Sequence, residues 1–410
     1  MELKNSPADR QRVFLFLQMP QSRFAVQLRQ KLMAAGHQVY KINFCGGDVF
    51  HWGQPGGHNF TGGINDWPAW FSAFLDRRPP TDLLMIGDRR PLHQVAALLA
   101  RLRGVRVWVF DEGYMRPHFI TMEENGVNGY SSFPRDPETI LTLARDLPEV
   151  APPPNLPPDV YQKVKDVVKH HIGNLALLPL FRRYQTHRPS SAVRESLGLA
   201  SRYLSRKKRR RRDEAALKEF LSGGRKYFFV PLQLAADTQI RHYSKFLGIK
   251  DFIAAILASF KRSAPPDWSL VVRSHPLDWL IRQHRRFTLN YARAIGLSDR
   301  VCYVDEGNTN SMIVGSGGLA LINSTTGANA LLMGKPVFCL GQAIYGIPGL
   351  ATSGGEAGLD AFWSAPTEPR PELCDAFIRL LQARAVLPGN FYTAEGIAMA
   401  LEGCLNRLGV

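Results

Sequence analysis

Residues 227–237 (YFFVPLQLAAD) and residues 270–278 (LVVRSHPLD) give the clearest indication of the fold. Their aromatic and β-branched residues predict a buried strand, then a short helix, then a second strand. Gln233 and Asp237 follow the first strand, and Arg273 and His275 follow the second. In a parallel α/β sheet, ligands bind beyond the carboxyl ends of the strands. We therefore expect these side chains to share a site for an anionic ligand that carries a phosphate.

A second signal lies further along, where residues 319–322 predict a strand that runs into NSTTG. The turn contains Asn323, Ser324, Thr325 and Thr326 and precedes a predicted helix. Backbone N–H groups and the positive end of a helix favour an anion, and the hydroxyls can bond a phosphate. The GxxxxGK spacing of a Walker loop is missing. The alternative is a simple Ser/Thr helix cap.

The first half of the chain predicts another α/β sheet, because buried strands alternate with helical patterns. The glycine-rich sequence CGGD follows the second strand and is interpreted as a loop. The predicted strands are residues 13–19, 39–44, 83–86 and 105–110.

The last two of these strands end in charged clusters. Asp88 and Arg89 follow the third strand, whereas Asp111, Glu112 and Arg116 follow the fourth. Two neighbouring strand ends with such clusters indicate a second site on the rim of the sheet. The alternative is that Asp88 caps the next helix and that Asp111 and Arg116 form a solvated pair.

At 410 residues the chain fits two domains and a linker. We predict an α/β protein of the GT-B-like type, in which two Rossmann-like, doubly wound domains face a central cleft. This is the architecture of nucleotide-sugar transferases, with the nucleotide on the second half and the acceptor on the first. The predicted parts are an N-terminal acceptor-side domain at residues 1–150, a helical basic linker at 151–224, a nucleotide-sugar domain at 225–365, and C-terminal helices at 366–410 that pack back on the N-terminal domain.

The linker carries much of the net charge of +16, including the sequence RKKRRRR from Arg206 to Arg212. Such a run is either a solvated charge tract or a contact with an anionic membrane surface. Aromatic residues for base stacking are absent from it, so we predict no nucleic-acid partner. The flanking helices, predicted at residues 160–180 and 192–204, are amphipathic and basic. They either lie on the membrane or dock on the protein itself.

Five scattered cysteines without CxxC spacing predict free thiols and no metal site. No apolar run approaches the roughly 18 residues of a spanning helix. The polar N-terminus lacks the apolar core of a signal peptide. We therefore expect a cytoplasmic protein.

Several long motifs, in order, resemble the bacterial capsule polysaccharide synthesis family, specifically its S-type transferases. The likeness covers nearly the whole chain. The motifs are KINFCGGD at residues 41–48, GDRRPLH at 87–93, DEGYMRPHFITMEENGVN at 111–128, VPLQLAADTQIRHYS at 230–244, HPLD at 275–278, INSTTGANAL at 322–331, GQAIYGIPGL at 341–350 and NFY at 390–392.

The resemblance implies a retaining β-Kdo glycosyltransferase, which uses CMP-β-Kdo and a phosphatidylglycerol-type lipid at the cytoplasmic face of the inner membrane. It acts with a C-type Kdo transferase as partner. No cofactor or metal is expected, because a protonated His275 and a helix N-terminus can neutralise the departing CMP. Alternatives are a transferase of the same fold that uses another nucleotide sugar, and a non-catalytic scaffold of capsule assembly.

The family's roles carry over to matching positions of this sequence. Asp237 matches the carboxylate proposed as nucleophile, although it could instead orient the substrate. Glu112 would activate or orient the acceptor hydroxyl, and Arg116 would help to bind anionic groups. The residues expected to bind CMP-Kdo are Gln233, Arg273, His275, Pro276, Asn323, Ser324, Thr325 and Thr326, and those expected on the acceptor side are Asp88, Arg89, Asp111 and Arg116.

Overall fold

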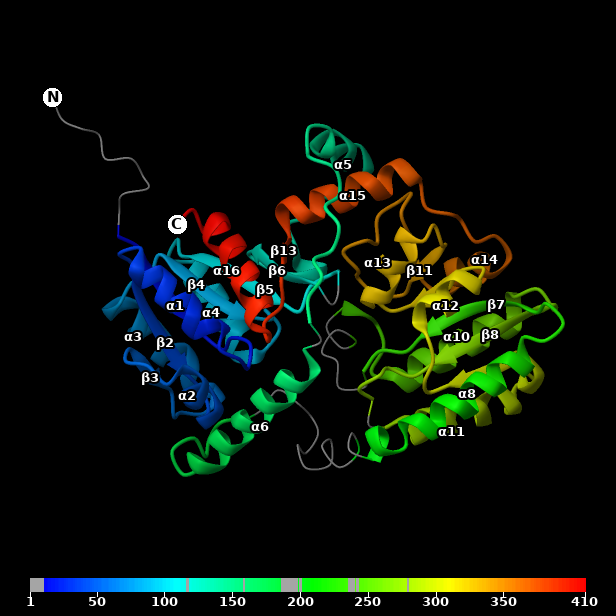
Figure 1. The fold of residues 1–410 in the computed structure, drawn as a ribbon, viewed down its shortest axis with the longest axis horizontal. Coiled ribbons are helices and arrows are strands. Elements are labelled where there is room, and N and C mark those ends of the chain that lie inside the picture. Colours follow the sequence, from blue (N-terminus) through cyan, green and yellow to red (C-terminus); the bar gives the residue numbers. More distant parts are fainter. Residues whose placement is uncertain are drawn as a thin grey trace. The chain divides into compact units, whose positions relative to one another are not determined.

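The computed structural model describes residues 11–115, 118–157, 159–185, 198, 201–234, 240, 243–278 and 280–410. Two of the predicted site residues, Asp237 and Arg116, lie outside the described residues, and so does most of the predicted helix at 192–204. The chain divides into two compact units (Figure 1). Unit 1 contains residues 1–133, 148–187 and 381–410, and unit 2 contains residues 134–147 and 188–380.

Unit 1 is built on a seven-stranded sheet with the order β13-β6-β5-β4-β1-β2-β3. Strands β1 to β5 are parallel, whereas β6 runs antiparallel to β5 and β13 antiparallel to β6. The part β3-β2-β1-β4-β5 has the Rossmann order, which reverses direction between β1 and β4. The strands are β1 (Val13–Phe16), β2 (Gln38–Asn43), β3 (Gly57–Asn59), β4 (Asp82–Ile86), β5 (Arg106–Asp111), β6 (Phe119–Glu124) and β13 (Val386–Pro388).

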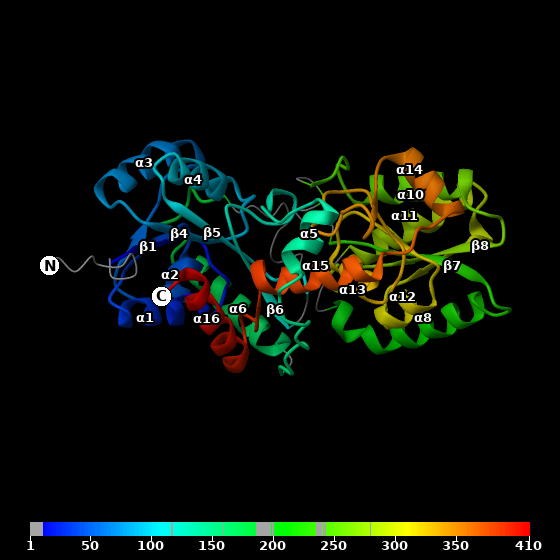
Figure 2. The same ribbon diagram turned by 90° about the horizontal axis from the view of Figure 1, so that it is seen from above.

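Helices cover both faces of the unit 1 sheet, as the continuous apolar character of its strands requires. Phe14 and Phe16 of β1 pack on one face with residues of α1 and α16, whereas Leu15 and Leu17 pack on the other with α3 and α4. Figure 2 shows these two helix layers on opposite sides of the strands. The helices are α1 (Phe24–Ala34), α2 (Gly46–Trp52), α3 (Trp67–Arg77), α4 (Pro91–Arg101), α6 (Val160–Ala176) and α16 (Ala394–Leu408).

Unit 2 contains a six-stranded, fully parallel sheet with the order β12-β11-β10-β7-β8-β9. Counted from β7, this is the Rossmann order 3-2-1-4-5-6, with its reversal between β7 and β10. Phe228 and Val230 of β7 pack against α10 and α14. The strands are β7 (Lys226–Pro231), β8 (Trp268–Arg273), β9 (Val301–Val304), β10 (Leu319–Leu321), β11 (Val337–Cys339) and β12 (Thr352–Ser353).

The helices associated with unit 2 include α8, which begins at the polybasic run. They are α5 (Pro137–Ala144), α8 (Arg206–Phe220), α10 (Ile249–Ser263), α11 (Ile281–Ala294), α12 (Thr309–Gly315), α13 (Thr325–Leu332) and α14 (Glu356–Ser364), with α15 (Pro371–Arg384) crossing into unit 1. Within the described part of the chain, every helix is too short or too polar to traverse a lipid bilayer.

The α/β fold with two Rossmann-like units is confirmed, whereas a shared central cleft stays a prediction. The predicted boundaries fall differently, because the linker does not form a separate part. Its residues up to 187 pack in unit 1, and those from 188 onward belong to unit 2. Residues 134–147 also belong to unit 2, and the chain returns to unit 1 at Leu381.

The expectation that CGGD forms a loop is wrong, because Gly46 begins α2. Asp48 in the first helical turn accepts a hydrogen bond from the backbone N–H of Phe44 at 2.9 Å, which closes the turn. A Cβ at Gly46 would overlap the carbonyl of Gly173 in α6. The glycine is therefore needed for close packing of the two helices, not for a loop.

Candidate functional site

Gln233 and Asn323 meet at the point where the strand order of unit 2 reverses. Gln233 Nε2 donates to Asn323 Oδ1 at 2.9 Å, and the backbone N–H of Asn323 donates to Gln233 Oε1 at 3.2 Å. Gln233 follows β7 and Asn323 follows β10, so this pair joins the carboxyl ends of two neighbouring strands. In sheets of this kind the crevice at the reversal is where ligands bind.

The turn at Ser324 begins α13 directly beside this pair. Ser324 Oγ accepts a hydrogen bond from the backbone N–H of Thr326 at 3.2 Å, so the cap foreseen as the simple alternative is present. Ser324 Oγ also donates to Thr326 Oγ1 at 3.2 Å. A cap satisfies only part of the first turn, and the positive end of the helix still favours an anion. The predicted anion-binding turn therefore lies at the reversal point of the sheet.

The predicted basic residues after β8 reach the same edge. His275 Nδ1 accepts a hydrogen bond from the backbone N–H of Leu277 at 3.1 Å, which assigns the ring proton of the neutral form to Nε2. Arg273 donates to the carbonyl of Gly307 at 3.3 Å, and burial lowers the pKa of its guanidinium. The Nε atom of Arg273 is buried without a hydrogen-bond partner among the described residues. A buried N–H donor without a protein partner is suited to bind an anionic ligand.

Asp278, the last residue of the HPLD motif, points away from this edge into the protein. It is 1% exposed, and its carboxylate bonds His284 Nδ1 at 2.6 Å and the backbone N–H of Leu280 at 3.0 Å. Asp278 therefore stabilises the loop that carries His275 by contacts within the protein, and its carboxylate is not placed for contact with a ligand.

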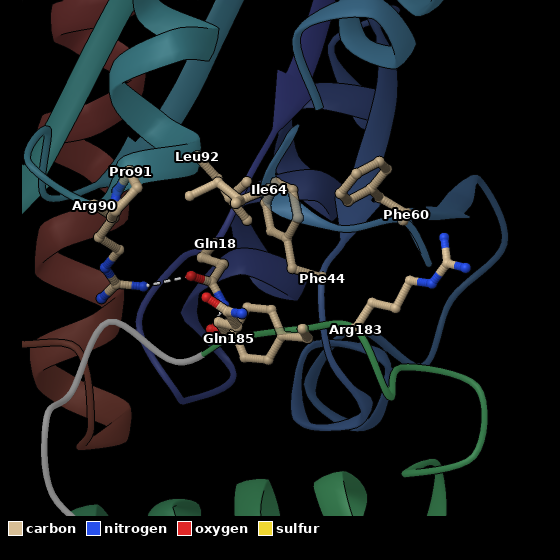
Figure 3. A pocket seen from close by; sticks show the side chains of 11 residues that line it. Gln18, Phe44, Phe60, Ile64, Arg90, Pro91, Leu92, Arg183 and Gln185 are labelled. Atoms are coloured by element: carbon tan, nitrogen blue, oxygen red, sulfur yellow. Dashed lines mark hydrogen bonds between the residues drawn. The ribbon is translucent and has the colours of Figure 1, made fainter. Parts of the chain in front are cut away.

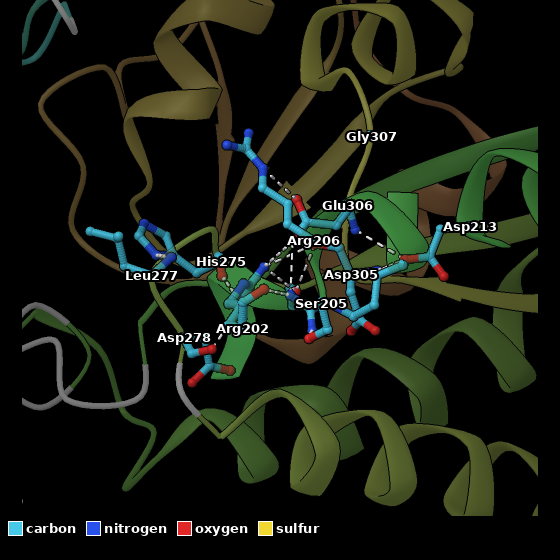
Figure 4. Close-up of polar contacts among 12 residues, drawn as sticks. Arg202, Ser205, Arg206, Asp213, His275, Leu277, Asp278, Asp305, Glu306 and Gly307 are labelled. Atoms are coloured by element: carbon cyan, nitrogen blue, oxygen red, sulfur yellow. Dashed lines mark hydrogen bonds and ion pairs between the residues drawn. The ribbon is translucent and has the colours of Figure 1, made fainter. Parts of the chain in front are cut away.

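Arg202 is a residue of this site that the sequence did not reveal. Its guanidinium is almost fully buried and donates to the carbonyls of His275 (2.8 Å), Asp278 (2.8 Å) and Asp305 (3.0 Å) (Figure 4). It also pairs with the Glu306 carboxylate at 3.5 Å. By these contacts Arg202 fixes the loop that carries His275. The only sequence signal was one more arginine beside a basic run.

The polybasic run divides into two faces because it is helical. Arg206, Arg209 and Arg212 lie near carboxylates of unit 2, with Arg206 and Arg209 3.5 and 3.6 Å from Glu306 and Arg212 2.8 Å from Asp305. The buried Asp213 accepts hydrogen bonds from the backbone N–H groups of Asp305 and Glu306. Three of the seven residues in the run thus stabilise the protein itself. Contact of the exposed remainder with a membrane stays a prediction.

At the reversal point of unit 1, Gln18 joins the ends of β1 and β4. Arg90 donates to Gln18 Oε1 at 2.9 Å, and Gln18 Nε2 lies 3.1 Å from the Asp48 carboxylate and 3.2 Å from the Tyr184 hydroxyl. These residues border a pocket of about 100 Å³ that is aromatic on one side (Figure 3). Its lining consists of Gln18, Phe44, Phe60, Gly62, Ile64, Arg90, Pro91, Leu92, Arg183, Tyr184 and Gln185.

The other predicted acceptor-side residues are largely held by the protein. Asp88 is 2% exposed and pairs with Arg89 at 3.2 Å, and the guanidinium of Arg89 lies over the Tyr130 ring. Asp88 does not cap α4, whose N-cap is Arg90. Asp111 accepts a hydrogen bond from the backbone N–H of Glu112 at 2.7 Å.

Glu112 bonds two groups that the sequence did not connect with it. Its Oε1 accepts from Lys163 Nζ of α6 at 2.6 Å and from the Tyr392 hydroxyl at 3.0 Å. The side chains of Glu112 and Lys163 are each 32% exposed, so the carboxylate is oriented and still accessible. Tyr392 belongs to the NFY motif, which the C-terminal segment brings to this rim.

Cys45, Asp48 and His170 could be considered as metal ligands, since one atom of each lies within 4.8 Å of the others. The Asp48 carboxylate already accepts hydrogen bonds from Phe44 N and Gln18, and burial raises the pKa of the Cys45 thiol well above its usual range. The buried ammonium of Lys41 supplies positive charge beside Asp48. The charge and the hydrogen-bonding capacity of Asp48 are therefore met by neighbouring protein groups. The five cysteines are free thiols, as predicted.

Residues 81–392 match the family model described as "Capsule polysaccharide biosynthesis protein". The chain belongs to this family. The resemblance predicted from the motifs is thereby confirmed, and the protein has a role in capsule polysaccharide biosynthesis.

Two curated members of the family are similar over most of their length. The capsule polysaccharide export protein KpsS of Escherichia coli is 30% identical, over 92% of this chain and 96% of that protein. The capsule polysaccharide modification protein LipB of Neisseria meningitidis serogroup A is also 30% identical, over 92% and 91%. Among solved structures, the β-Kdo 2,7 transferase of Thermosulfurimonas dismutans KpsC aligns over 96% of this chain and 99% of its own at 15% identity, with a TM-score of 0.45.

Proposed function

We propose that this capsule biosynthesis protein is a retaining β-Kdo glycosyltransferase, which transfers Kdo from CMP-β-Kdo to a phosphatidylglycerol-type lipid. The observation that carries the proposal is the edge of unit 2, where three groups suited to an anion flank β7. They are the buried Nε of half-buried Arg273, which has no hydrogen-bond partner among the described residues, the imidazole of His275 and the N-terminus of α13. A nucleotide phosphate is the ligand whose charge and acceptor oxygens match this set.

In this proposal the CMP phosphate lies against the first turn of α13, where Ser324, Thr325 and Thr326 supply hydroxyl and backbone donors. His275 donates a proton or hydrogen bond to the departing phosphate oxygen, and Arg273 balances its charge. Negative charge develops on the phosphate as the sugar–oxygen bond breaks, and these donors stabilise it. We propose that no metal ion or other cofactor is required.

Retention of configuration follows from two successive inversions. The Asp237 carboxylate, which follows β7, attacks the anomeric carbon and expels CMP. The acceptor hydroxyl then attacks the same carbon and releases Asp237, while its proton passes to Glu112. Lys163 and Tyr392 hold the Glu112 carboxylate in position for this step. A role for Asp237 in orienting the sugar is the alternative that the test below separates.

The proposal places the reaction at the cytoplasmic face of the inner membrane, where CMP-Kdo and the lipid meet. The anionic headgroup of the acceptor fits the basic Arg89 of unit 1, and the family resemblance adds Arg116, which lies outside the described residues. A C-type Kdo transferase that extends the product is the partner this chemistry requires.

The test is mass spectrometry of a fluorescent phosphatidylglycerol analogue after incubation with the full chain and CMP-Kdo generated in situ. The wild type should add one or more Kdo units. Asp237→Ala and His275→Ala should abolish addition, whereas the exposed control Asp146→Ala should not. If the wild-type protein is folded but adds no Kdo, Kdo transfer is refuted. The alternatives are then a transferase that uses another nucleotide sugar and a non-catalytic scaffold.

The Asp237→Ala protein also distinguishes the two roles of that carboxylate. A true nucleophile can be replaced chemically by small external anions such as azide or formate, which restore some turnover to the alanine variant. An orienting carboxylate does not show such rescue, because the first bond to the sugar never involves it.

A further inference from the structure

Helix α6 directs its polar face toward the protein. Lys163 bonds Glu112, the buried Asp166 offers its carbonyl to His51 at 3.1 Å, and Asn174 accepts from the backbone N–H of Gly47 at 2.7 Å. Close contact between Gly173 and α2 holds the helix against unit 1. A surface helix ordinarily buries its apolar stripe, so α6 is inverted.

The outward face of α6 is apolar over its whole length. Its members recur at intervals of three and four residues, which places them on one side of the helix. We call this set the α6 stripe, and each side chain in it is more than half exposed. It consists of Tyr161 (72%), Val164 (57%), Val168 (51%), Ile172 (56%) and Leu175 (75%).

The charges beside the α6 stripe are all of one sign. Lys165 and Lys169 are exposed along its flank, and Arg182 and Arg183 are exposed beyond the end of the helix. The one carboxylate within α6, Asp166, is buried on the opposite face. Exposed charged side chains between residues 160 and 185 are therefore cationic throughout, and they attract an anionic surface.

We propose that the α6 stripe is the surface by which this protein lies on an anionic lipid bilayer. A single apolar stripe flanked by lysines matches the interfacial zone, where apolar side chains enter the acyl boundary and cations meet lipid phosphates. The inner face of the same helix holds Glu112 through Lys163. Docking α6 on a bilayer therefore brings the acceptor-side rim to the membrane. Its relevance to catalysis rests on the proposed function, whereas the binding itself does not.

The experiment is flotation of the full chain with phosphatidylcholine vesicles that contain or lack phosphatidylglycerol. The triple variant Val164→Gln, Val168→Gln and Ile172→Gln should reduce partition at least about tenfold, which corresponds to about 1.4 kcal/mol. Because these side chains are exposed, the variant should keep the melting temperature of the wild type. Lys165→Gln with Lys169→Gln should weaken binding only to vesicles with phosphatidylglycerol.

The matched control is Leu98→Gln with Leu102→Gln, at two exposed apolar residues in the same unit, one on α4 (57%) and one at its C-cap (74%). This control should bind as the wild type does. Equal binding by the α6 variant would overturn the proposal, and so would a shift from dimer to monomer by that variant in the absence of lipid, which would assign the stripe to a second copy. Transfer to a short-chain, water-soluble acceptor separates the two proposals, since the α6 variant should retain it.

Discussion

The two units share the Rossmann strand order and a glutamine at the point of reversal, yet their polar edges are held differently. In unit 2, Asp305 and Glu306, which follow β9, pair with Arg209 and Arg212 of α8, a helix that precedes the sheet in sequence. In unit 1, Gln18 and Arg90 border a pocket, and Glu112 accepts hydrogen bonds from Lys163 and Tyr392. The edge proposed to bind the donor is thus preorganised by charge, whereas the edge proposed to bind the acceptor borders a pocket.

The two basic helices extend this contrast. Helix α8 turns cations inward, toward Asp305 and Glu306, and exposes further cations on its other side. Helix α6 turns its polar groups inward and exposes an apolar stripe. Both helices are basic, yet they turn different groups toward the protein. The four predictions below test the differences between and within the two units.

The largest effect is expected from Glu112→Gln in unit 1. The amide keeps an oxygen for Lys163 and Tyr392 but cannot accept a proton, so kcat should fall roughly a hundredfold to ten-thousandfold. Stability should change by less than about 1 kcal/mol, because the ion pair is partly exposed. Steady-state kinetics and calorimetry measure the two quantities. The exposed Glu124→Gln is the control, and a variant as active as the control would exclude Glu112 from the chemistry.

Next in size is Arg202→Ala in unit 2. Loss of this guanidinium removes a donor from three loop carbonyls and takes away one of the three arginines beside Glu306, which should cost about 3 to 5 kcal/mol of unfolding free energy. CMP binding should weaken as well, since the His275 loop loses its support. Urea unfolding and calorimetric titration measure these effects. Arg210→Ala should change stability by less than about 0.5 kcal/mol, because its partner Glu214 is exposed. Equal effects of the two variants would contradict the structural role assigned to buried Arg202.

A smaller effect is expected at the amino edge of the unit 1 sheet, where Asp82 is fully buried. Arg12 and Arg106 pair with it at 2.6 and 3.1 Å, and Trp108 donates to it at 2.9 Å. Asp82→Asn should cost about 2 kcal/mol of stability. Activity should persist at temperatures where the variant is folded, because this edge lies opposite the ligand-binding edge.

This stability contribution should depend on pH in a defined direction. Burial by itself would raise the pKa of Asp82, but hydrogen bonds from Arg12, Thr81 and Trp108 lower it overall. Because the pKa of Asp82 is lower in the folded protein than in the unfolded chain, ionised Asp82 contributes its full stabilisation at pH values above the unfolded pKa of about 3.9. This contribution is lost as the pH falls through the pKa of Asp82 in the folded protein. The difference in melting temperature between wild type and Asp82→Asn should therefore shrink below about pH 4. A difference in melting temperature that does not change with pH would contradict the lowered pKa of Asp82.

The smallest effect is expected from Lys207→Gln with Lys208→Gln, on the exposed side of α8. Unfolding free energy should change by less than about 0.5 kcal/mol, because both side chains are solvated. Arg212→Gln should cost more, since it removes ion pairs with Asp213 and Asp305. The unfolding midpoints of the lysine double variant and of Arg212→Gln show which side of α8 contributes to stability. A greater loss from the lysine pair would reverse the assignment of faces.

Much of the fold could be predicted because strand and helix periodicity are local properties. The stretch around residues 227–278 predicted β7, α10 and β8 correctly, and the strand ends carried Gln233, Arg273 and His275 to one edge. The pairing of β6 with β13 was missed, since it joins residues that are more than two hundred positions apart. A local sequence pattern does not indicate which distant strand will pair with β6.

The sequence alone was enough to predict the two Rossmann-like units, the family and the positions of Gln233, Arg273 and His275 at strand ends, because these follow from periodicity and from motifs. Tertiary structure alone decided which arginines face inward, that Arg202 supports the His275 loop, and that α6 exposes its apolar side. The physical reason is that an amphipathic or basic helix has two faces. The carboxylates and glycines that choose between them lie on other elements, such as Asp305 for α8 and Gly46 for α6.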